Sequence, residues 1–111
     1  MGRATRVLEY LDADGQSPFA SWFDELHAAA AAKVAAALYQ LEAGNFSNCK
    51  SVGGGVLERR IFFGPGYRIY FGRVGETVVI LLGGSTKVSQ GRSIAIVRER
   101  WLEYRRRLVS R

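Results

Sequence analysis

The sequence predicts an α+β fold, because helical and strand periodicities occupy different parts of the chain. In the first half, apolar residues recur three and four positions apart, as on one face of a helix. In the second half, runs of β-branched and aromatic residues are separated by short turns rich in glycine. Segregated rather than alternating patterns favour the α+β class. A chain of 111 residues is expected to form one domain, 1–111.

The first half begins with an expected strand over 6–11 (RVLEYL), followed by a turn and a helix. Ser17 suits the helix N-cap, and Pro18 suits the first helical position, where its missing N–H would have no partner. The alanine-rich segment continues as helix, either directly or after a very short break. Gly44 fits the left-handed position beyond its end. The result is a helical hairpin whose apolar face needs a sheet to pack on.

The second half predicts a three-stranded antiparallel meander with strands at 56–63, 67–73 and 77–84. The segment before it, 46–55, ends in three glycines and is expected to be a loop. Another loop is expected at 85–91, followed by a C-terminal helix over 92–108 whose apolar stripe packs on the sheet. The expected order is therefore an N-terminal strand, a helical hairpin, a three-stranded meander and a C-terminal helix.

The charge is distributed unevenly along a chain whose formal net charge is +6. Residues 1–55 hold four basic and six acidic side chains, whereas residues 56–111 hold twelve basic and four acidic ones. A basic half favours nucleic acid as a partner, although the same surface could serve solubility alone.

A single cysteine excludes an internal disulfide and a thiolate zinc cluster. No apolar stretch suits a membrane span or a signal peptide, so we expect a cytoplasmic protein without a membrane partner.

The first hairpin of the meander contains charged side chains within otherwise apolar strands. Its turn, Gly64-Pro65-Gly66, predicts a register in which Phe63 pairs with Tyr67. One face, toward the helices, would then carry Leu57, Ile61, Ile69 and Phe71. The other, here called the polar face, would carry Glu58, Arg60, Phe62, Arg68 and Tyr70. Arg59 falls on the apolar face, which predicts a sheet margin or a bulge at that point.

The polar face is either a solvated surface or a binding site. As a surface, it would hold a weak Glu58–Arg60 ion pair. In either case Arg68 is expected to face solvent and to be replaceable at little cost in stability. As a site, two neighbouring arginines favour a phosphate, whose oxygens match the planar guanidinium group. Lys87, in a loop after a buried strand, could reach the same face. Four further residues are expected to contact RNA, with the tyrosine as a stacking surface: Lys50, Tyr70, Gln90 and Arg92.

Several stretches resemble the RelE/ParE superfamily of toxins from type II toxin–antitoxin systems: SPFASWFDEL, QLEAGN, KSVGGGVLERRIFFGPGYRIYF, VVILLGGSTKVSQ and RERWLEYRRR. The sequence of these stretches is most similar to the HigB-like, phage-derived addiction-module killers, and the similarity extends over about residues 6–107. The resemblance implies a fold of the microbial-ribonuclease type and a cognate antitoxin, expected to be a helix-turn-helix DNA-binding protein. RelE-like and HigB-like members cut mRNA on the ribosome, whereas ParE-like members poison DNA gyrase on the same scaffold.

The resemblance also implies roles for individual residues. Arg68, in GPGYR, matches the family's phosphate-stabilising arginine. Arg60 matches the basic residue late in the preceding strand, and Lys87 the one beyond the last meander strand. No tyrosine or histidine lies between Lys87 and Trp101 to act as a general base. Glu58 is the candidate for that role because it shares the polar face.

These observations predict a toxin that is an mRNA endoribonuclease acting through the 2′-hydroxyl of its substrate. Neither a metal nor another cofactor is expected, because the sequence shows no cluster of ligand residues at recognisable spacing. Two alternatives share the scaffold or the charge. One is a ParE-like gyrase poison, and the other is an RNA-binding module without catalytic activity.

Overall fold

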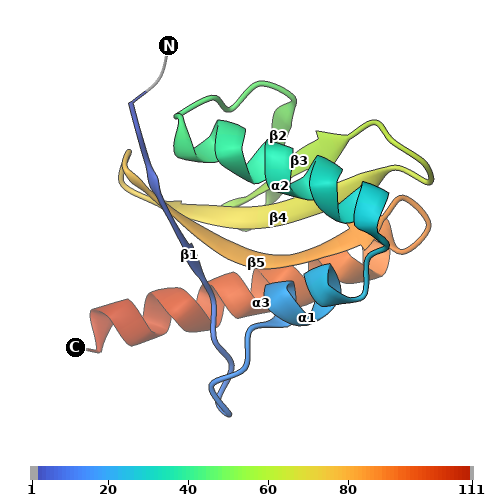
Figure 1. The fold of residues 1–111 in the computed structure, drawn as a ribbon. Coiled ribbons are helices and arrows are strands. Elements are labelled where there is room, and N and C mark those ends of the chain that lie inside the picture. The colour runs from blue at the N-terminus through green and yellow to red at the C-terminus, as the bar shows by residue number, and fades with distance from the viewer. Residues whose placement is uncertain (1–2, 111) are drawn as a thin grey trace.

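A five-stranded mixed sheet organises the fold, which a computed structural model describes for residues 3–110. In chain order the elements are β1 (Arg6–Glu9), α1 (Pro18–Asp24), α2 (Ala28–Glu42), β2 (Cys49–Gly53), β3 (Val56–Ile61), β4 (Tyr67–Val74), β5 (Val78–Thr86) and α3 (Gln90–Val109) (Figure 1). The strand order is β1-β5-β4-β3-β2. β1 runs parallel to β5, and the other neighbours are antiparallel. The predicted α+β class is confirmed.

The two N-terminal helices begin at capping side chains. Ser17 Oγ accepts a hydrogen bond from the backbone N–H three residues later, and Pro18 opens α1 as predicted. His27 Nδ1 accepts the equivalent bond at the start of α2, after a short break in the helix. Gly44, with φ of 82°, follows the last turn of α2. The two helix starts therefore have a local cause, because the side chains of Ser17 and His27 accept hydrogen bonds from backbone N–H groups that a helix end leaves without partners. At the end of α2, Gly44 adopts the left-handed conformation that glycine favours.

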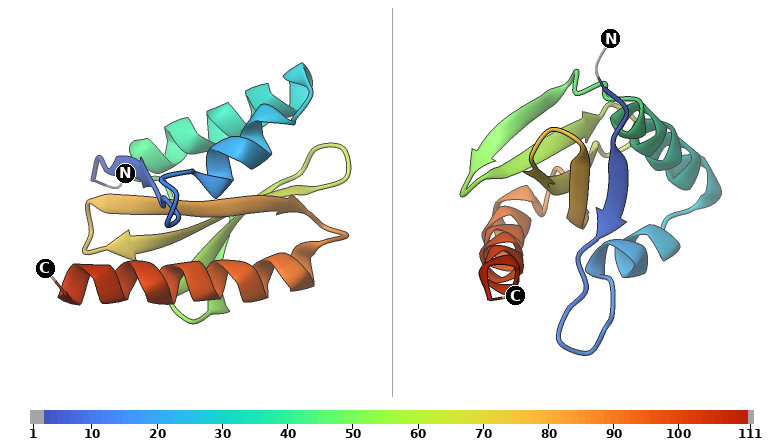
Figure 2. Two further views of the ribbon diagram at one scale, coloured as in Figure 1. Left: turned by 90° about the horizontal axis from the view of Figure 1, so that it is seen from below. Right: turned by 90° about the vertical axis from the view of Figure 1, so that its left-hand side faces the viewer.

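Helices cover both faces of the sheet, α1 and α2 on one and α3 on the other (Figure 2). Along β4 the alternation divides the side chains between two cores. Ile69 and Phe71 pack toward α2, whereas Tyr70 packs toward α3 beside Val97 and Trp101. The C-terminal stripe thus packs on the sheet, as predicted. No helix among residues 3–110 has the length and apolar character needed to cross a membrane.

The prediction of a loop at 46–55 is wrong, because residues Cys49–Gly53 form the edge strand β2. This strand pairs antiparallel with β3, with a bulge between Ser51 and Gly53. The three glycines at 53–55 all have positive φ and make the tight turn into β3. The meander therefore has four strands. β5 also extends to Thr86 and α3 starts at Gln90, so the predicted loop 85–91 is shorter than expected.

The predicted register of the β3–β4 hairpin is wrong by two residues. Tyr67 pairs with Ile61 rather than Phe63, because residues 62–66 form a wider turn. A shift of two preserves the face of every side chain, since the side-chain period in a strand is two. The polar face is therefore assembled as predicted. Within it, Arg60 lies opposite Arg68, and Glu58 lies opposite Tyr70.

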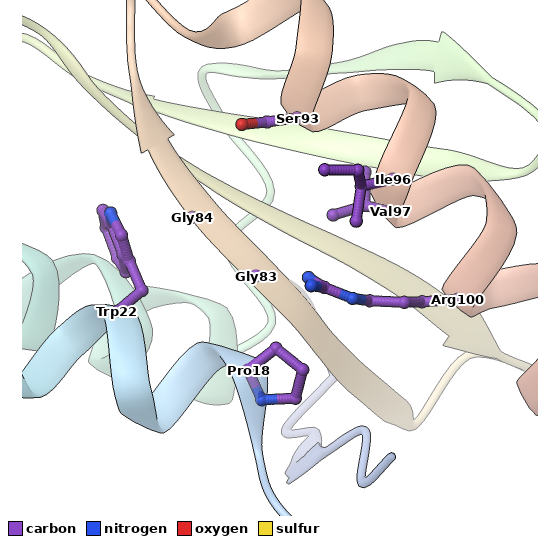
Figure 3. Close-up of a pocket in the computed structure, with 8 residues that line it drawn as sticks. All are labelled: Pro18, Trp22, Gly83, Gly84, Ser93, Ile96, Val97 and Arg100. Carbon is purple, nitrogen blue, oxygen red and sulfur yellow. The ribbon is translucent and has the colours of Figure 1, made fainter. Parts of the chain in front are cut away.

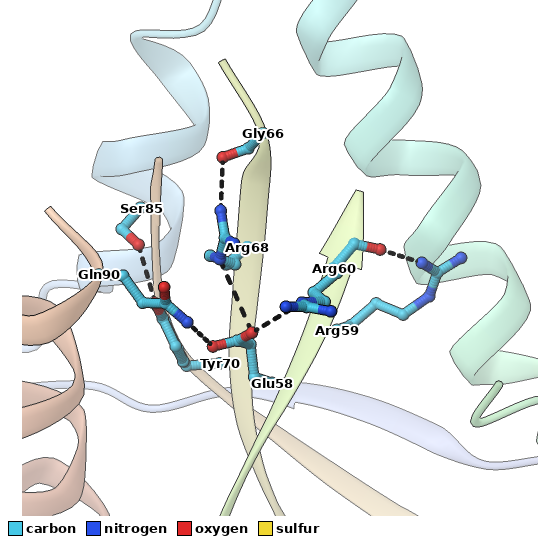
Figure 4. A network of polar contacts seen from close by, with 8 residues as sticks. All are labelled: Glu58, Arg59, Arg60, Gly66, Arg68, Tyr70, Ser85 and Gln90. Carbon is cyan, nitrogen blue, oxygen red and sulfur yellow. Dashed lines mark hydrogen bonds and ion pairs between the residues drawn. The ribbon is translucent and has the colours of Figure 1, made fainter. Parts of the chain in front are cut away.

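Arg59 sits in a regular, interior part of the sheet rather than at a margin or bulge. It pairs with Ile69 and is 8% exposed. Its guanidinium donates a hydrogen bond to the Arg60 carbonyl oxygen (Figure 4) and another to Gln40 Oε1 on α2. A cation on the apolar face is tolerated there because polar partners accept hydrogen bonds from both of its terminal nitrogens, Nη1 and Nη2, although its Nε–H is buried without a partner.

Gly83 and Gly84 in β5 have no side chain, so neighbouring side chains can approach the backbone of the strand. The two glycines line a pocket between α1 and α3, together with Trp22 and Arg100 (Figure 3). A Cβ atom on Gly84 would lie 2.3 Å from the Trp22 ring, and one on Gly83 would lie 2.8 Å from Arg100 Nη1. Arg100 also donates a hydrogen bond to the Leu82 carbonyl oxygen at 2.8 Å. The glycines therefore fix how closely the helices pack on β5.

Gly84→Ala is expected to lower the free energy of unfolding by about 1–3 kcal/mol, because the methyl group overpacks against the Trp22 ring. Gly91→Ala is the matched control, since a Cβ atom there meets nothing within 4 Å. We expect the control to change stability by less than about 1 kcal/mol, in the stabilising direction. Urea unfolding of both variants measures the difference. Equal stabilities would contradict the packing described for Trp22.

Candidate functional site

Three predicted cations converge on one pocket of about 170 Å³. Arg60 comes from β3, Arg68 from β4, and Lys87 from the loop that follows β5. The Lys87 N–H donates to the Gly66 carbonyl oxygen at 2.9 Å, which holds that loop against the β3–β4 turn. Phe62 also lines the pocket. Residues distant in sequence are thus assembled by strand pairing and by one loop-to-turn contact.

Glu58 lies beneath this pocket and is fully buried. Its Oε1 is 3.7 Å from both Arg60 Nε and Arg68 Nε. Its Oε2 accepts a hydrogen bond from Gln90 Nε2 at 2.6 Å, so α3 contributes to the same network (Figure 4). A buried carboxylate requires paired charges and hydrogen bonds, and Glu58 has both. Against three cations there is one carboxylate, which leaves a surplus of positive charge facing the pocket.

The two arginines differ in exposure and therefore in what they can do. The Arg60 side chain is 40% exposed, so its guanidinium can meet a ligand directly. The Arg68 side chain is 7% exposed, and its Nη1 donates to the Gly66 carbonyl oxygen at 3.1 Å. Arg68 is held between this carbonyl and Glu58, which fixes the plane of its guanidinium. Such a preorganised cation suits an anion that binds at the pocket mouth.

The expectation that Arg68 faces solvent is wrong, which removes the reason for expecting that it is replaceable at little cost in stability. Its side chain is enclosed and forms half of the charge compensation for Glu58. Removing one member of a buried ion pair leaves the other uncompensated, which destabilises a protein far more than losing a surface pair. Arg68→Ala therefore tests stability and function together. A substitution that keeps the positive charge separates the two.

Glu58 was the sequence-based candidate for a general base. Its carboxylate has no exposed surface, and α3 covers it through Gln90. A group that accepts a proton from a substrate must come within hydrogen-bond distance of it. The arrangement instead makes Glu58 a positioning residue that holds Arg60 and Arg68 side by side.

Tyr70 cannot provide the stacking surface expected of it, because it is fully buried under α3. Its hydroxyl forms a hydrogen bond with Ser85 Oγ at 2.9 Å, and burial raises the pKa of the phenol. Tyr70 thus lies next to Glu58 on the buried side of the polar network. The exposed aromatic residue at the pocket is Phe62, which is 78% exposed. Strand alternation had placed Phe62 on the polar face, but no role was predicted for it.

The remaining predicted RNA contacts occupy different positions. Lys50, on β2, pairs with Glu58 in register and is exposed on the same face of the sheet. Gln90 points inward to Glu58 rather than outward. Arg92 is exposed on the first turn of α3 and does not line the pocket. Lys50 and Arg92 can therefore add only peripheral charge.

Comparison with known proteins places the chain in a family. It is 42% identical over 77 residues to an uncharacterized protein of Haemophilus influenzae, an alignment that covers 68% of this chain and 78% of the relative. The chain belongs to the family of that Haemophilus protein. No family model matches the sequence. No solved structure matches it either.

The functional groups that this protein presents to a ligand are those of the cation pocket formed by Arg60, Arg68 and Lys87. Burial raises the pKa of Cys49 to about 11, so the neutral thiol predominates at physiological pH and is a poor nucleophile. The single histidine, His27, caps α2 on the opposite side of the sheet. Within residues 3–110, no three His, Cys, Asp or Glu side chains are grouped so that they could hold a metal ion. The pocket is suited to binding and stabilising negative charge.

Proposed function

We propose that the protein is the toxin of a type II toxin–antitoxin pair and that it cleaves mRNA on the ribosome in the cytoplasm. The observation that carries the proposal is the convergence of Arg60, Arg68 and Lys87 on one pocket, over the buried carboxylate of Glu58. The sequence resemblance to RelE-like and HigB-like toxins supplies the reaction class. On this proposal the fold is of the RelE-like, microbial-ribonuclease type.

The proposed reaction uses the 2′-hydroxyl of the substrate as the nucleophile. Its oxygen attacks the adjacent phosphorus and releases its proton to a solvent water molecule, while the bond to the 5′-oxygen breaks, which leaves a 2′,3′-cyclic phosphate and a 5′-hydroxyl. Negative charge grows on the phosphorane oxygens during this step. Arg60 and Arg68 stabilise that charge, because fixed donors aimed at developing charge are often the largest catalytic contribution. Lys87 serves as a third cation or donates the proton to the departing 5′-oxygen.

Positioning takes a large share of the proposed catalysis, because the described residues that line the pocket include neither a carboxylate nor an imidazole to act as the general base. Glu58 orients the arginines and does not contact the substrate. Holding the 2′-oxygen in line with the scissile bond can supply several orders of magnitude in rate, and a ribosome that fixes the mRNA supplies that alignment. This accounts for a nuclease that depends on the ribosome.

The proposed partner is a cognate antitoxin, a helix-turn-helix DNA-binding protein by the sequence resemblance. A second surface on the toxin supports a protein partner. Toward its end, α3 exposes Leu102 and Val109 beside Arg105 and Arg106, and these residues line a shallow pocket. An exposed apolar patch with a basic flank suits an acidic amphipathic segment.

Induction of the protein in a bacterial host tests the proposal. We expect growth arrest, with new mRNA ends inside translated codons when the transcripts are mapped by primer extension. A plasmid supercoiling assay is run on the same cells. Intact mRNA together with a loss of supercoiling would favour a gyrase poison and contradict the proposal. Arrest with neither lesion would indicate an RNA-binding module.

A further inference from the structure

Phe62 is an exposed aromatic side chain at the mouth of the cation pocket. It follows β3 directly and is 78% exposed. The Arg60 guanidinium carbon lies 6.0 Å from the centre of its ring. Lys87 lines the same pocket. An aromatic ring left in water beside two cations offers a flat, electron-rich surface that nothing in residues 3–110 covers.

The neighbouring residue shows that the exposure of Phe62 is set by its position. Phe63 turns to the opposite face, where its ring packs against the α2 side and lies 5.4 Å from Lys33 Nζ. Tyr39, on α2, is similarly exposed at 74% but does not line this pocket. Single exposed aromatic residues are ordinary on protein surfaces. The combination of an exposed ring with a phosphate-suited pocket is what distinguishes Phe62.

We propose that Phe62 is a stacking subsite for one unpaired nucleobase of single-stranded RNA. The inference rests on the proposed function and adds to it the feature of the substrate that is recognised next to the reacting phosphate. A base stacks on one face of an aromatic ring, and Arg60, whose guanidinium lies over the ring, adds a cation–π contribution. In a paired duplex the bases are stacked on one another and expose no face. The subsite therefore selects a single-stranded segment.

The geometry also limits what the subsite can read. A ring face without hydrogen-bonding groups recognises area rather than identity, so any base is accepted and a purine binds more strongly than a pyrimidine. The nearby cations engage the phosphate and contribute no discrimination between bases. Phe62 is thus expected to fix the position of one nucleotide relative to Arg60 and Arg68.

Equilibrium binding of a five-nucleotide single-stranded RNA tests the subsite without requiring cleavage. The oligonucleotide carries 2′-deoxyribose throughout the cleavable positions, and 2-aminopurine is placed at each position in turn. Fluorescence anisotropy of a labelled copy gives affinity, and quenching of 2-aminopurine reports stacking. The proteins compared are the wild type, Phe62→Ala, Phe62→Trp and Tyr39→Ala, the last being the control for an exposed aromatic residue elsewhere.

We expect Phe62→Ala to weaken binding about tenfold or more, a loss typical of one stacked base. Quenching at one position should disappear in this variant, return with Phe62→Trp and persist with Tyr39→Ala. The salt dependence should stay unchanged, because the number of phosphate contacts does not change. Removing the base at the quenched position should weaken the wild type but not Phe62→Ala.

Wild-type affinity in Phe62→Ala, no binding by the wild type, or equal quenching at all positions would overturn the subsite. A variant that loses antitoxin affinity but keeps RNA affinity would do so too and would assign Phe62 to a protein interface. The two proposals can fail separately. Phe62-dependent stacking without any mRNA cleavage removes the nuclease, whereas cleavage indifferent to Phe62 removes the subsite alone.

Discussion

Arg68→Lys is expected to lower single-turnover cleavage of ribosome-bound mRNA by about 10²–10³-fold. Lysine keeps the charge but loses the planar group that lies between Glu58 and the Gly66 carbonyl oxygen. A point charge on a flexible stem cannot hold two phosphorane oxygens at once. Ribosome affinity should fall much less, because non-specific binding to RNA counts cations. Cleavage rate and ribosome affinity are measured on the same preparation.

Two other substitutions locate this effect. Arg60→Lys should reduce cleavage less than Arg68→Lys, because Arg60 is more exposed and less firmly held. Arg73→Lys is the matched control, since Arg73 lies on the same strand but bonds to the Glu76 carbonyl oxygen outside the pocket. Equal, modest losses of cleavage and affinity in Arg68→Lys would mean that the arginine only docks the protein.

Glu58→Gln has the second large expected effect, and it acts on stability. The substitution keeps the size of the side chain but removes the anion between two arginines that face each other in register. Loss of one member of a buried ion pair destabilises by about 3–5 kcal/mol, and the 40% exposure of Arg60 places the expected loss at the lower end. Urea unfolding gives the value.

A kinetic readout separates positioning from stability alone. At a temperature where Glu58→Gln remains folded, the cation surplus at the pocket is larger, so RNA should bind at least as tightly as to the wild type. Cleavage should nevertheless fall, because the guanidinium groups are no longer held in place. Gln90→Ala, which removes only the hydrogen bond to Oε2, should show the same split more weakly. Wild-type stability and turnover in Glu58→Gln would refute the positioning role.

The sequence predicted the features that depend on local chemistry. Ser17, Pro18 and Gly44 affect helix ends through the backbone of residues close to them in sequence, so these helix ends can be predicted without a structure. The composition of the polar face was also predictable, although the register was not. Alternation is insensitive to a shift of two residues, whereas the pairing itself depends on the width of the turn at 62–66.

The errors concern features that distant segments decide. β2 is short, polar and at the sheet edge, so its pattern resembles a loop until β3 pairs with it. Whether the polar face is exposed to solvent depends on α3, which is formed by residues near the end of the sequence. That helix buries Glu58 and Tyr70 and leaves Phe62 exposed. The roles expected of Glu58 and Tyr70 therefore changed, and Phe62, for which no role was predicted, is the exposed ring. The three cations lie around one pocket as predicted.

The central claim is cleavage through the substrate's own 2′-hydroxyl, and a single-atom change in the substrate tests it most directly. Purified protein is added to ribosomes programmed with mRNA, and the cleaved position is mapped. The same message is then prepared with one 2′-deoxynucleotide at that position. We expect the unmodified RNA to yield a 2′,3′-cyclic phosphate and the modified RNA to resist cleavage there, with ribosome binding unchanged. Undiminished cleavage of the modified message, or a 3′-hydroxyl end, would contradict the account.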